Sequence, residues 1–229
     1  MTSGLPAWLD LLRSHTSRFA ELLERGDLNA PISACPGWSL HDLADHLGGV
    51  HQWAAHAIVT GSPQYTPEPA AAETGALAAW YRRHASYLVD AIAERPPDAP
   101  AWTMDPENQT TGFWTRRQVH ETAMHCWDAE AATDTPRPFE PCLAWDGVLE
   151  VATVIYPRQA RLGRIGPLPN ALSLVALDVP GEIRIGLGEP VEIRSSAETL
   201  LRLLWHRADP DEEQVPARAL RTLSLPLTP

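Results

Sequence analysis

Residues 116–130, RRQVHETAMHCWDAE, hold several side chains that can bind a metal or move a proton, within about four turns of a helix. HETAMH is one residue longer than HExxH, the helical zinc-protease motif, because His120 and His125 are five residues apart instead of four. Each residue advances by about 100° around an α-helix, so these two side chains diverge by roughly 140°. They cannot chelate one ion from a regular helix, and the zinc-protease interpretation fails.

A second spacing in the same stretch is compatible with metal binding. Glu121 and His125 are four residues apart and therefore lie about 40° out of register, on one shared face. Asp128, three residues further, extends this face by one turn. A helical Glu/His pair is a known way to place two metal ligands in the core of a helix bundle. Two ligands are not enough, so a third must come from another helix.

The candidates for this third ligand are four histidines that recur every five residues in one predicted helix: His41, His46, His51 and His56. They spiral around that helix and cannot all face inward. His46 lies in the mainly apolar run LADHLGGVHQW, and we expect it to be the most core-like of the four. A set of His46, Glu121 and His125 leaves one or two coordination positions open, as catalytic zinc requires.

Each of these residues also has an ordinary structural interpretation. A glutamate and a histidine four residues apart are commonly a surface pair, and a histidine on an apolar face is commonly a core residue with a satisfied hydrogen bond. Cys126 points about 100° away from His125, which favours a place in the core over metal ligation. His120 is either a group that bonds a ligand or substrate, or part of the helix surface.

Composition narrows the class of protein. The chain has 229 residues, of which 44% are hydrophobic and 21% charged, as in ordinary globular proteins. Its formal net charge of −11 argues against non-specific binding to nucleic acid or to anionic membranes. No apolar run approaches the roughly 18–20 residues that cross a bilayer. The first residues mix acids and bases into apolar positions, unlike a signal peptide, so we expect a cytoplasmic protein.

The cysteines and basic residues carry further information. Three cysteines, Cys35, Cys126 and Cys142, are too few and too scattered for a disulfide framework or a four-thiolate zinc site. We expect them to be buried free thiols. All 18 basic residues are arginines, which together with abundant alanine and proline suggests a GC-rich genome.

Hydrophobic periodicity predicts four long helices in the first part of the chain, over residues 5–26, 40–59, 73–94 and 116–132. Four such helices joined by loops of moderate length predict a four-helix bundle. The pair Gly48-Gly49 inside the second helix is locally unfavourable, and we expect a neighbouring element to approach closely there.

Two of these helices have predicted start signals. Ser39 is a good N-cap, and Asp42 three residues later makes a partner of the capping-box type. Thr115 and Gln118 form the corresponding signature for the fourth helix, which we therefore expect to begin at about residue 116.

A polar segment with three prolines, TDTPRPFEP at 133–141, is the predicted domain boundary. Beyond it we expect a helix over 142–156, strands within 172–179, 182–188 and 190–196, and a helix over 196–208 that Ser195 or Ser196 caps. The prediction is α+β overall. It comprises a four-helix metal-binding domain over 1–135 and a small C-terminal α+β domain over 141–229.

Three stretches resemble one known family. CPGWSLHDLADHLGGVHQWA, RRQVHETAMHCWDAE and SAETLLRLLWHRA are similar to the mycothiol-dependent maleylpyruvate isomerase family, which belongs to the DinB-like metal-binding four-helix bundles. The resemblance covers nearly the whole chain. It implies zinc bound by His46, Glu121 and His125, the set that helix geometry also selects. It further implies a basic residue from the C-terminal domain near the active site, with Arg207 the best match and Arg202 the alternative.

The resemblance also implies the chemistry. Zinc would lower the pKa of mycothiol, and the thiolate would attack a small electrophile, giving either a cis–trans isomerase or an S-transferase. Nickel, cobalt or iron could occupy the same ligands. Arg207 could hold a substrate carboxylate. His120 or Asp128 could relay protons or orient His125.

Two other functions fit the same residues. One is a metal-dependent hydrolase that uses zinc-bound water, and the other is a binding module with a structural or vestigial metal. For the enzyme, we expect a small-molecule thiol and an electrophilic substrate as partners, with no nucleic acid and no membrane. We expect a monomer or a homodimer.

Overall fold

The computed structural model describes residues 7–132 and 136–229. The chain forms two compact units, one reaching to Arg137 and one beginning at Pro138. The predicted start of the first helix, at residues 5 and 6, lies outside the described residues, as do residues 133–135 of the predicted boundary segment. The domain limits at 135 and 141 stay predictions.

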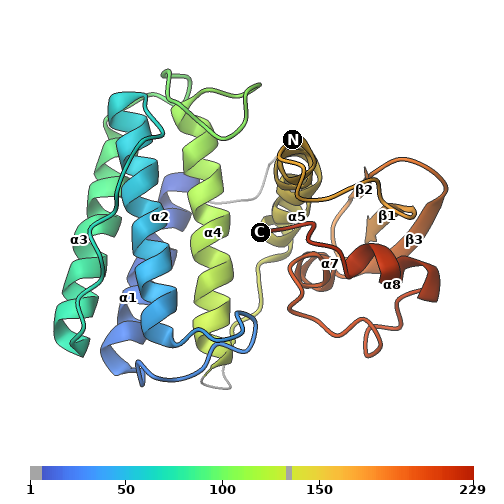
Figure 1. Ribbon diagram of the computed structural model, residues 1–229, viewed down its shortest axis with the longest axis horizontal. Coiled ribbons are helices and arrows are strands. Elements are labelled where there is room, and N and C mark those ends of the chain that lie inside the picture. The colour runs from blue at the N-terminus through green and yellow to red at the C-terminus, as the bar shows by residue number, and fades with distance from the viewer. Residues whose placement is uncertain (1–6, 133–135) are drawn as a thin grey trace. The chain divides into compact units, whose positions relative to one another are not determined.

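The first unit consists of long helices that lie side by side (Figure 1): α1 Trp8–Arg25, α2 Leu40–Thr60, α3 Thr74–Ala93 and α4 Thr111–Ala131. Helix α1 packs against α3 and α4, and α2 packs against the same two helices. Their shared core is apolar and includes Phe19, Leu23, Leu43, Leu47, Leu77, Tyr81 and Cys126, none of which is exposed. The predicted helices are confirmed. An apolar stripe accounts for the packing of α1, whereas α4 is buried almost all round and buries many polar side chains.

Helix α2 begins where its capping box predicts. The amide of Asp42 donates to the Ser39 hydroxyl at 3.3 Å, and the amide of Ser39 donates to Oδ2 of Asp42 at 2.8 Å. Gly48 also behaves as predicted, because a Cβ there would lie 2.3 Å from the Trp80 ring of α3. At Gly49 the nearest atom to such a Cβ is 3.7 Å away, which leaves ordinary room.

Helix α4 starts five residues earlier than predicted. The N-cap is Thr110, whose hydroxyl accepts a hydrogen bond from the amide of Phe113 at 3.3 Å. Thr115, the predicted cap, lies inside the helix and donates its hydroxyl to the carbonyl of Thr111 at 3.0 Å. The stretch TGFWT combines a glycine with residues of modest helix propensity, so its helical conformation depends on packing, with Phe113 and Trp114 buried.

The second unit is mixed in structure. Its helical elements are α5 Pro141–Glu150, the π-helical turn η1 Val151–Ile155, α6 Tyr156–Arg161, α7 Ala197–Leu204 and α8 Ala217–Leu223. Its strands are β1 Ala171–Ala176, β2 Glu182–Ile185 and β3 Pro190–Ser195. They form a sheet in the order β2-β1-β3, with β2 antiparallel and β3 parallel to β1. The predicted α+β class is confirmed. Helix α8 was not predicted.

The cysteines differ in environment. Cys126 is fully buried and donates its thiol to the carbonyl of His15 at 3.2 Å, as expected for a core residue. Cys35 is partly buried, and Cys142 is exposed in the first turn of α5, next to Pro141. All three are free thiols. The prediction that all are buried is therefore wrong for Cys142.

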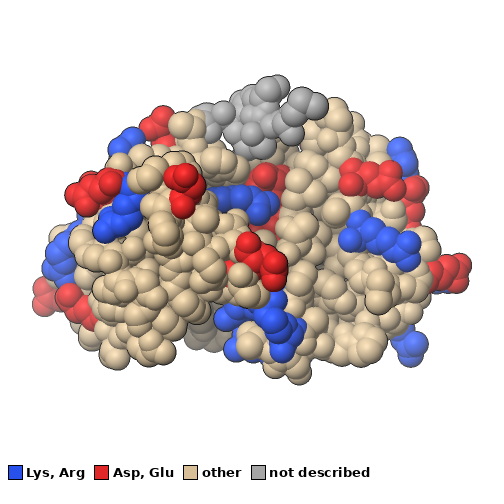
Figure 2. All heavy atoms as spheres, turned by 90° about the horizontal axis from the view of Figure 1, so that it is seen from above, with Lys and Arg blue, Asp and Glu red and all other residues tan. Residues whose placement is uncertain are grey.

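Charged side chains are spread over the surface. On the face that Figure 2 shows, acidic and basic groups alternate and form no extended basic area among the described residues. Among the described helices, none is both long enough and apolar enough to pass through a bilayer.

Candidate metal centre

Three side chains from two helices meet inside the first unit. Nε2 of His46, on α2, lies 3.2 Å from Oε1 of Glu121, on α4. Nε2 of His125 lies 3.4 Å from the same oxygen. One ligand atom from each residue lies within 4.8 Å of the others. The spacing of Glu121 and His125 along the helix thus places both on one face, and this face meets His46 of α2.

The three side chains differ in exposure. Glu121 and His125 are buried, whereas the side chain of His46 is 36% exposed. The prediction that His46 is the most core-like histidine of α2 is wrong, because His51 is fully buried. Nε2 of His51 lies 3.0 Å from the Thr122 hydroxyl. Burial lowers the pKa of His51 to about 3, so this ring is neutral.

His125 is oriented by a neighbour on its own helix. Asp128, which is 1% exposed, accepts a hydrogen bond from Nδ1 of His125 at 3.0 Å. Nε2 is therefore the nitrogen directed at Glu121 and His46. Burial disfavours the charged ring, but hydrogen bonds to Asp128 and Glu121, and the charges of both, raise the pKa of His125 to about 9. Without a cation the ring is protonated at neutral pH, and a bound cation would replace the proton on Nε2.

Arg117 is a part of this cluster that sequence reasoning missed. Its guanidinium forms a buried ion pair with Oε2 of Glu121, the oxygen that does not face the two histidines. Burial alone would raise the pKa of Glu121, but Arg117 and the two histidines hold it well below its usual range. The signal in the sequence was an arginine four residues before the glutamate, a spacing that places both on one helix face.

His120 lies away from this cluster on α4. It is 6% exposed, and its ring contacts that of Trp8 with centroids 5.6 Å apart. The interpretation of His120 as helix surface is therefore wrong, because the residue packs against α1. A role for His120 in bonding a ligand or substrate stays a prediction.

Solvent can reach the cluster through a pocket beside His46. This pocket, of about 470 Å³, is lined by residues of α2 and of the loop that follows it: Asp45, His46, Gly49, Val50, Trp53, Pro67 and Pro69. The ring of Trp38, from the CPGW stretch, lies 5.0 Å from that of His46 between centroids. A small molecule in this pocket would contact His46, whereas Glu121 and His125 are not among the residues that line it.

The two arginines predicted to contribute from the C-terminal part belong to the second unit. The guanidinium of Arg202, in α7, donates to the carbonyl of Arg207 at 2.8 Å. The guanidinium of Arg207 lies 5.6 Å from the ring centroid of Trp205. A role for either arginine at the metal centre stays a prediction.

The chemistry of the three ligands fits a divalent transition metal. Two imidazole nitrogens and one carboxylate oxygen form a donor set found at catalytic zinc, with the remaining positions open to solvent or substrate. The hydrogen bond from His125 to Asp128 is the support that metal-bound histidines usually have. The same donors suit nickel, cobalt and iron, so the three residues could hold a metal ion without selecting one.

The protein therefore belongs to a class with two units. One is a helical unit in which two histidines and a glutamate could bind a metal, and the other is an α+β unit. The chain belongs to the family described as the mycothiol maleylpyruvate isomerase N-terminal domain, which matches residues 9–130. The resemblance that the sequence motifs indicated is confirmed.

Two solved structures share the fold. A histidine-to-alanine mutant of the mycothiol-dependent maleylpyruvate isomerase matches with a TM-score of 0.66 and 16% identity, covering 89% of this chain and 90% of that chain. A structure titled as the mycothiol-dependent maleylpyruvate isomerase matches with a TM-score of 0.61 and 18% identity, covering 91% and 92%. No curated protein matches the sequence.

Proposed function

We propose that this chain is a metal-dependent enzyme that uses a low-molecular-weight thiol, mycothiol, to isomerise or conjugate a small electrophile. The observation that carries the proposal is the cluster of His46, Glu121 and His125, with His46 lining a pocket, in a chain of this family. Zinc bound there would lower the pKa of a coordinated thiol, so that the thiolate exists at neutral pH. The cytoplasm, where such thiols are kept reduced, is the compartment we propose.

The residues around the ligands would favour an anionic partner. Glu121 and Asp128 bring two negative charges and Arg117 brings one positive charge. A divalent cation among these three buried groups leaves one positive charge where charges interact strongly, while the carboxylate of Asp45 lines the neighbouring pocket. A thiolate would neutralise that charge. Asp128 would hold His125 in the productive orientation, and Arg117 would direct Oε1 of Glu121 toward the histidines.

The isomerase reaction would then need no net proton transfer. The thiolate sulfur forms a bond to one carbon of an activated cis double bond, and the electron pair of that double bond moves onto the conjugated carbonyl oxygen. The former double bond rotates, the carbonyl electron pair returns, and the carbon–sulfur bond breaks to release the trans isomer and the thiolate. In the transferase alternative the carbon–sulfur bond stays and the neighbouring carbon takes up a proton.

Substrate binding would fall to other side chains. An arginine of the second unit, Arg207 or Arg202, would hold a substrate carboxylate through paired hydrogen bonds. His120, buried against Trp8, would be limited to a supporting role. Maleylpyruvate, the substrate in the name of the related proteins, is the first compound to test.

The thiol requirement is tested with purified zinc-loaded protein. Maleylpyruvate and other electrophiles are supplied with mycothiol, and then without any thiol, while isomerisation, thioether formation and hydrolysis are measured separately. Turnover that depends on thiol supports the proposal. Equal turnover without thiol would contradict it and would favour a hydrolase that uses metal-bound water.

The ligand assignment is tested by metal analysis. His46→Ala and Glu121→Ala should each lose stoichiometric zinc and all activity, while His56→Ala, an α2 variant outside the cluster, should keep both. If both ligand variants retain one zinc per chain, the assignment is wrong. If zinc binds normally and no thiol chemistry is found, a binding module with a structural metal becomes the better explanation.

A further inference from the structure

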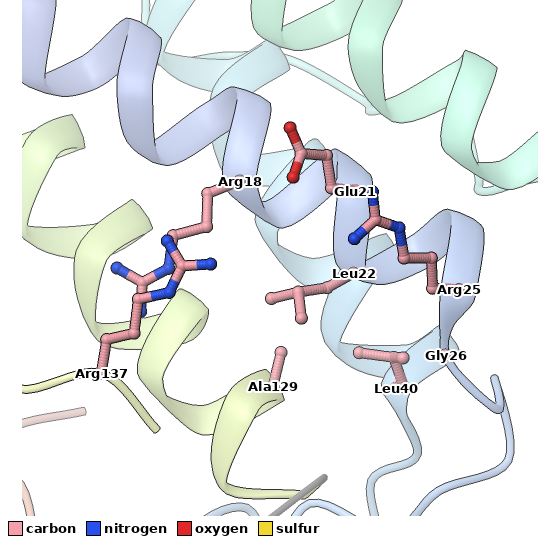
Figure 3. A pocket seen from close by; sticks show the side chains of 8 residues that line it. All are labelled: Arg18, Glu21, Leu22, Arg25, Gly26, Leu40, Ala129 and Arg137. Atoms are coloured by element: carbon pink, nitrogen blue, oxygen red, sulfur yellow. The ribbon is translucent and has the colours of Figure 1, made fainter. Parts of the chain in front are cut away.

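A second pocket of the first unit, separate from the metal cluster, gathers arginines. It has a volume of about 210 Å³ and is lined by Arg18, Glu21, Leu22, Arg25, Gly26, Leu40, Ala129 and Arg137. Figure 3 shows Arg18 and Arg137 on one side and Arg25 on the other, with Leu22 and Ala129 between them and Leu40 below Arg25. Three guanidinium groups around one small pocket are unexpected in a chain with a net charge of −11.

One buried carboxylate holds two of these arginines in place. Glu130, which is 2% exposed, accepts a hydrogen bond from Nε of Arg18 at 2.5 Å and forms an ion pair with its Nη2. Nε of Arg137 lies 3.4 Å from Oε1 of Glu130, and its backbone amide donates to Oε2 at 2.8 Å. The Arg18 guanidinium is thus held at the pocket by a paired contact, whereas that of Arg137 is 67% exposed and pairs with Glu130 through Nε alone. Both keep N–H groups for another acceptor.

The third arginine is not neutralised by an ion pair. Among the described residues, Arg25 has no hydrogen bond or salt bridge within the protein, although Glu21 lies one turn before it on α1. At the pocket, three positive groups therefore face the two carboxylates of Glu21 and Glu130, and one positive charge is in excess, since Glu24, next to Arg25 in the chain, is paired with Arg82. A guanidinium fork matches the geometry of a carboxylate, and an anion between Arg25 and the fixed pair would neutralise this charge.

The remaining wall of the pocket is apolar and small. Leu22, Leu40 and Ala129 offer hydrocarbon surface, and Gly26 admits no side chain, since a Cβ there would lie 2.8 Å from Leu40. At about 210 Å³ the pocket is smaller than the roughly 300–1,000 Å³ of sites for drug-sized ligands, so it suits a small molecule. A hydrated inorganic ion would gain nothing from the apolar wall, whereas a short carbon chain would bury surface against it.

We propose that this pocket is a binding site for a small organic carboxylate, with four to six carbon atoms as the class of best fit. Arg25 and the Glu130-anchored pair Arg18 and Arg137 would bind the carboxylate, and the leucines would contact its hydrocarbon part. The site is distinct from the metal ligands and does not depend on the proposed thiol chemistry.

The test is calorimetric titration of the metal-free protein, at constant ionic strength, with succinate, butyrate, inorganic phosphate and chloride. We expect saturable binding of the carboxylates. The double variant Arg25→Gln/Arg137→Gln should weaken it by about tenfold or more, as expected from loss of charge-assisted hydrogen bonds. The matched control is Arg13→Gln/Arg83→Gln, which removes two exposed arginines elsewhere in the unit and should leave binding unchanged.

Three results would overturn the proposal: no saturable binding of either carboxylate, equal binding by both double variants, or tighter binding of phosphate than of any carboxylate. Arg18 stays in place in all variants, because its removal would leave the buried Glu130 poorly compensated. If the double variant does not fold, the single variant Arg25→Gln gives the same comparison, because Arg25 is exposed and supports no contact that folding needs.

Discussion

Asp128 accepts a hydrogen bond from Nδ1 of His125 at 3.0 Å, and this bond directs Nε2 of His125 toward Glu121. Both residues are buried and lie three positions apart on α4. The contact fixes which ring nitrogen is available to a metal. It also strengthens that nitrogen as a donor, because a carboxylate partner increases the basicity of an imidazole.

Replacement of Asp128 by alanine should weaken zinc binding by roughly 10–100-fold, the usual cost of losing such a partner. Asp128→Asn keeps a hydrogen-bond acceptor and should lose less zinc affinity than Asp128→Ala. Competition with a coloured chelator measures both, and Asp90→Asn, an exposed change in α3, is the control. Equal zinc affinity in Asp128→Ala and the parent protein would show that the contact is only structural.

Arg117→Met should destabilise the metal-free protein more than the zinc-bound protein. Without the guanidinium, the buried carboxylate of Glu121 keeps only its two histidine partners, and loss of one partner of a buried ion pair costs about 3–5 kcal/mol. Bound zinc would supply the missing positive charge. Urea unfolding with and without zinc measures the difference in stability. Arg117→Lys keeps the charge, so its loss of stability should lie between those of the parent protein and Arg117→Met. An equal loss of stability in both states would contradict this role.

Zinc should bind more tightly as pH rises from 6 to 9. The pKa of His125 is raised to about 9, so below that pH the metal must displace a proton from the ring. For one displaced proton, the affinity increases about tenfold per pH unit. Chelator competition at several pH values measures the slope. A flat dependence between pH 7 and 8.5 would mean that His125 is already neutral in the metal-free protein.

The metal-free protein should lose stability as pH falls from 7 to 5. Burial lowers the pKa of His51 to about 3, and burial with the charge of Arg18 lowers that of His15 to about 4. Between these values and 6.5 the unfolded chain binds protons that the folded chain does not, so stability decreases toward acid. Each histidine contributes a slope of up to about 1.4 kcal/mol per pH unit. The raised pKa of His125 does not alter this slope well below pH 6.5, since the ring is then protonated in both states.

Urea unfolding at pH 7, 6 and 5 checks this prediction. His51→Asn should be less stable at pH 7 and should show a shallower dependence on pH, because one of the two histidines is gone. The same slope in His51→Asn and in the parent protein would mean that other groups cause the loss.

Gly48 and Gly49 should respond oppositely to alanine. A Cβ at Gly48 would lie 2.3 Å from the Trp80 ring, and overpacking of this kind typically costs about 1–3 kcal/mol. At Gly49 the nearest atom is 3.7 Å away, so the gain in helix propensity, up to about 1 kcal/mol, should prevail. Urea midpoints of the two variants measure the contrast, and similar midpoints would contradict the close approach of Trp80.

Much of the four-helix unit followed from local signals in the sequence. The capping box of Ser39 and Asp42 and the four-residue spacing of Glu121 and His125 are properties of a single helix, so they could be predicted without tertiary structure. His46, the candidate third ligand, was selected by the family resemblance and by an expected burial that the structure contradicts.

Other features depend on which helices meet, and a single sequence does not contain that information. The exposure of His46 and the burial of His51 reflect how α2 turns against α3 and α4, which an apolar neighbourhood in the sequence did not predict. The early start of α4 at Thr111 depends on burial of Phe113 and Trp114. In the pocket lined by three arginines, Arg18 of α1 and Arg137 both pair with Glu130, and more than a hundred residues of chain separate Arg18 from Glu130.

The capping box at the start of α2 has a consequence for changes in chain length. It anchors the helix at Ser39, and His46 follows seven residues later, about two turns along. Insertion or deletion of one residue between them would rotate the imidazole by about 100° and remove it from the cluster. Insertion or deletion of one residue in the loop between α2 and α3 would leave the orientation of the His46 side chain unchanged. Related sequences that keep the three ligands should therefore have a constant number of residues from 39 to 46 and a variable number from 62 to 73.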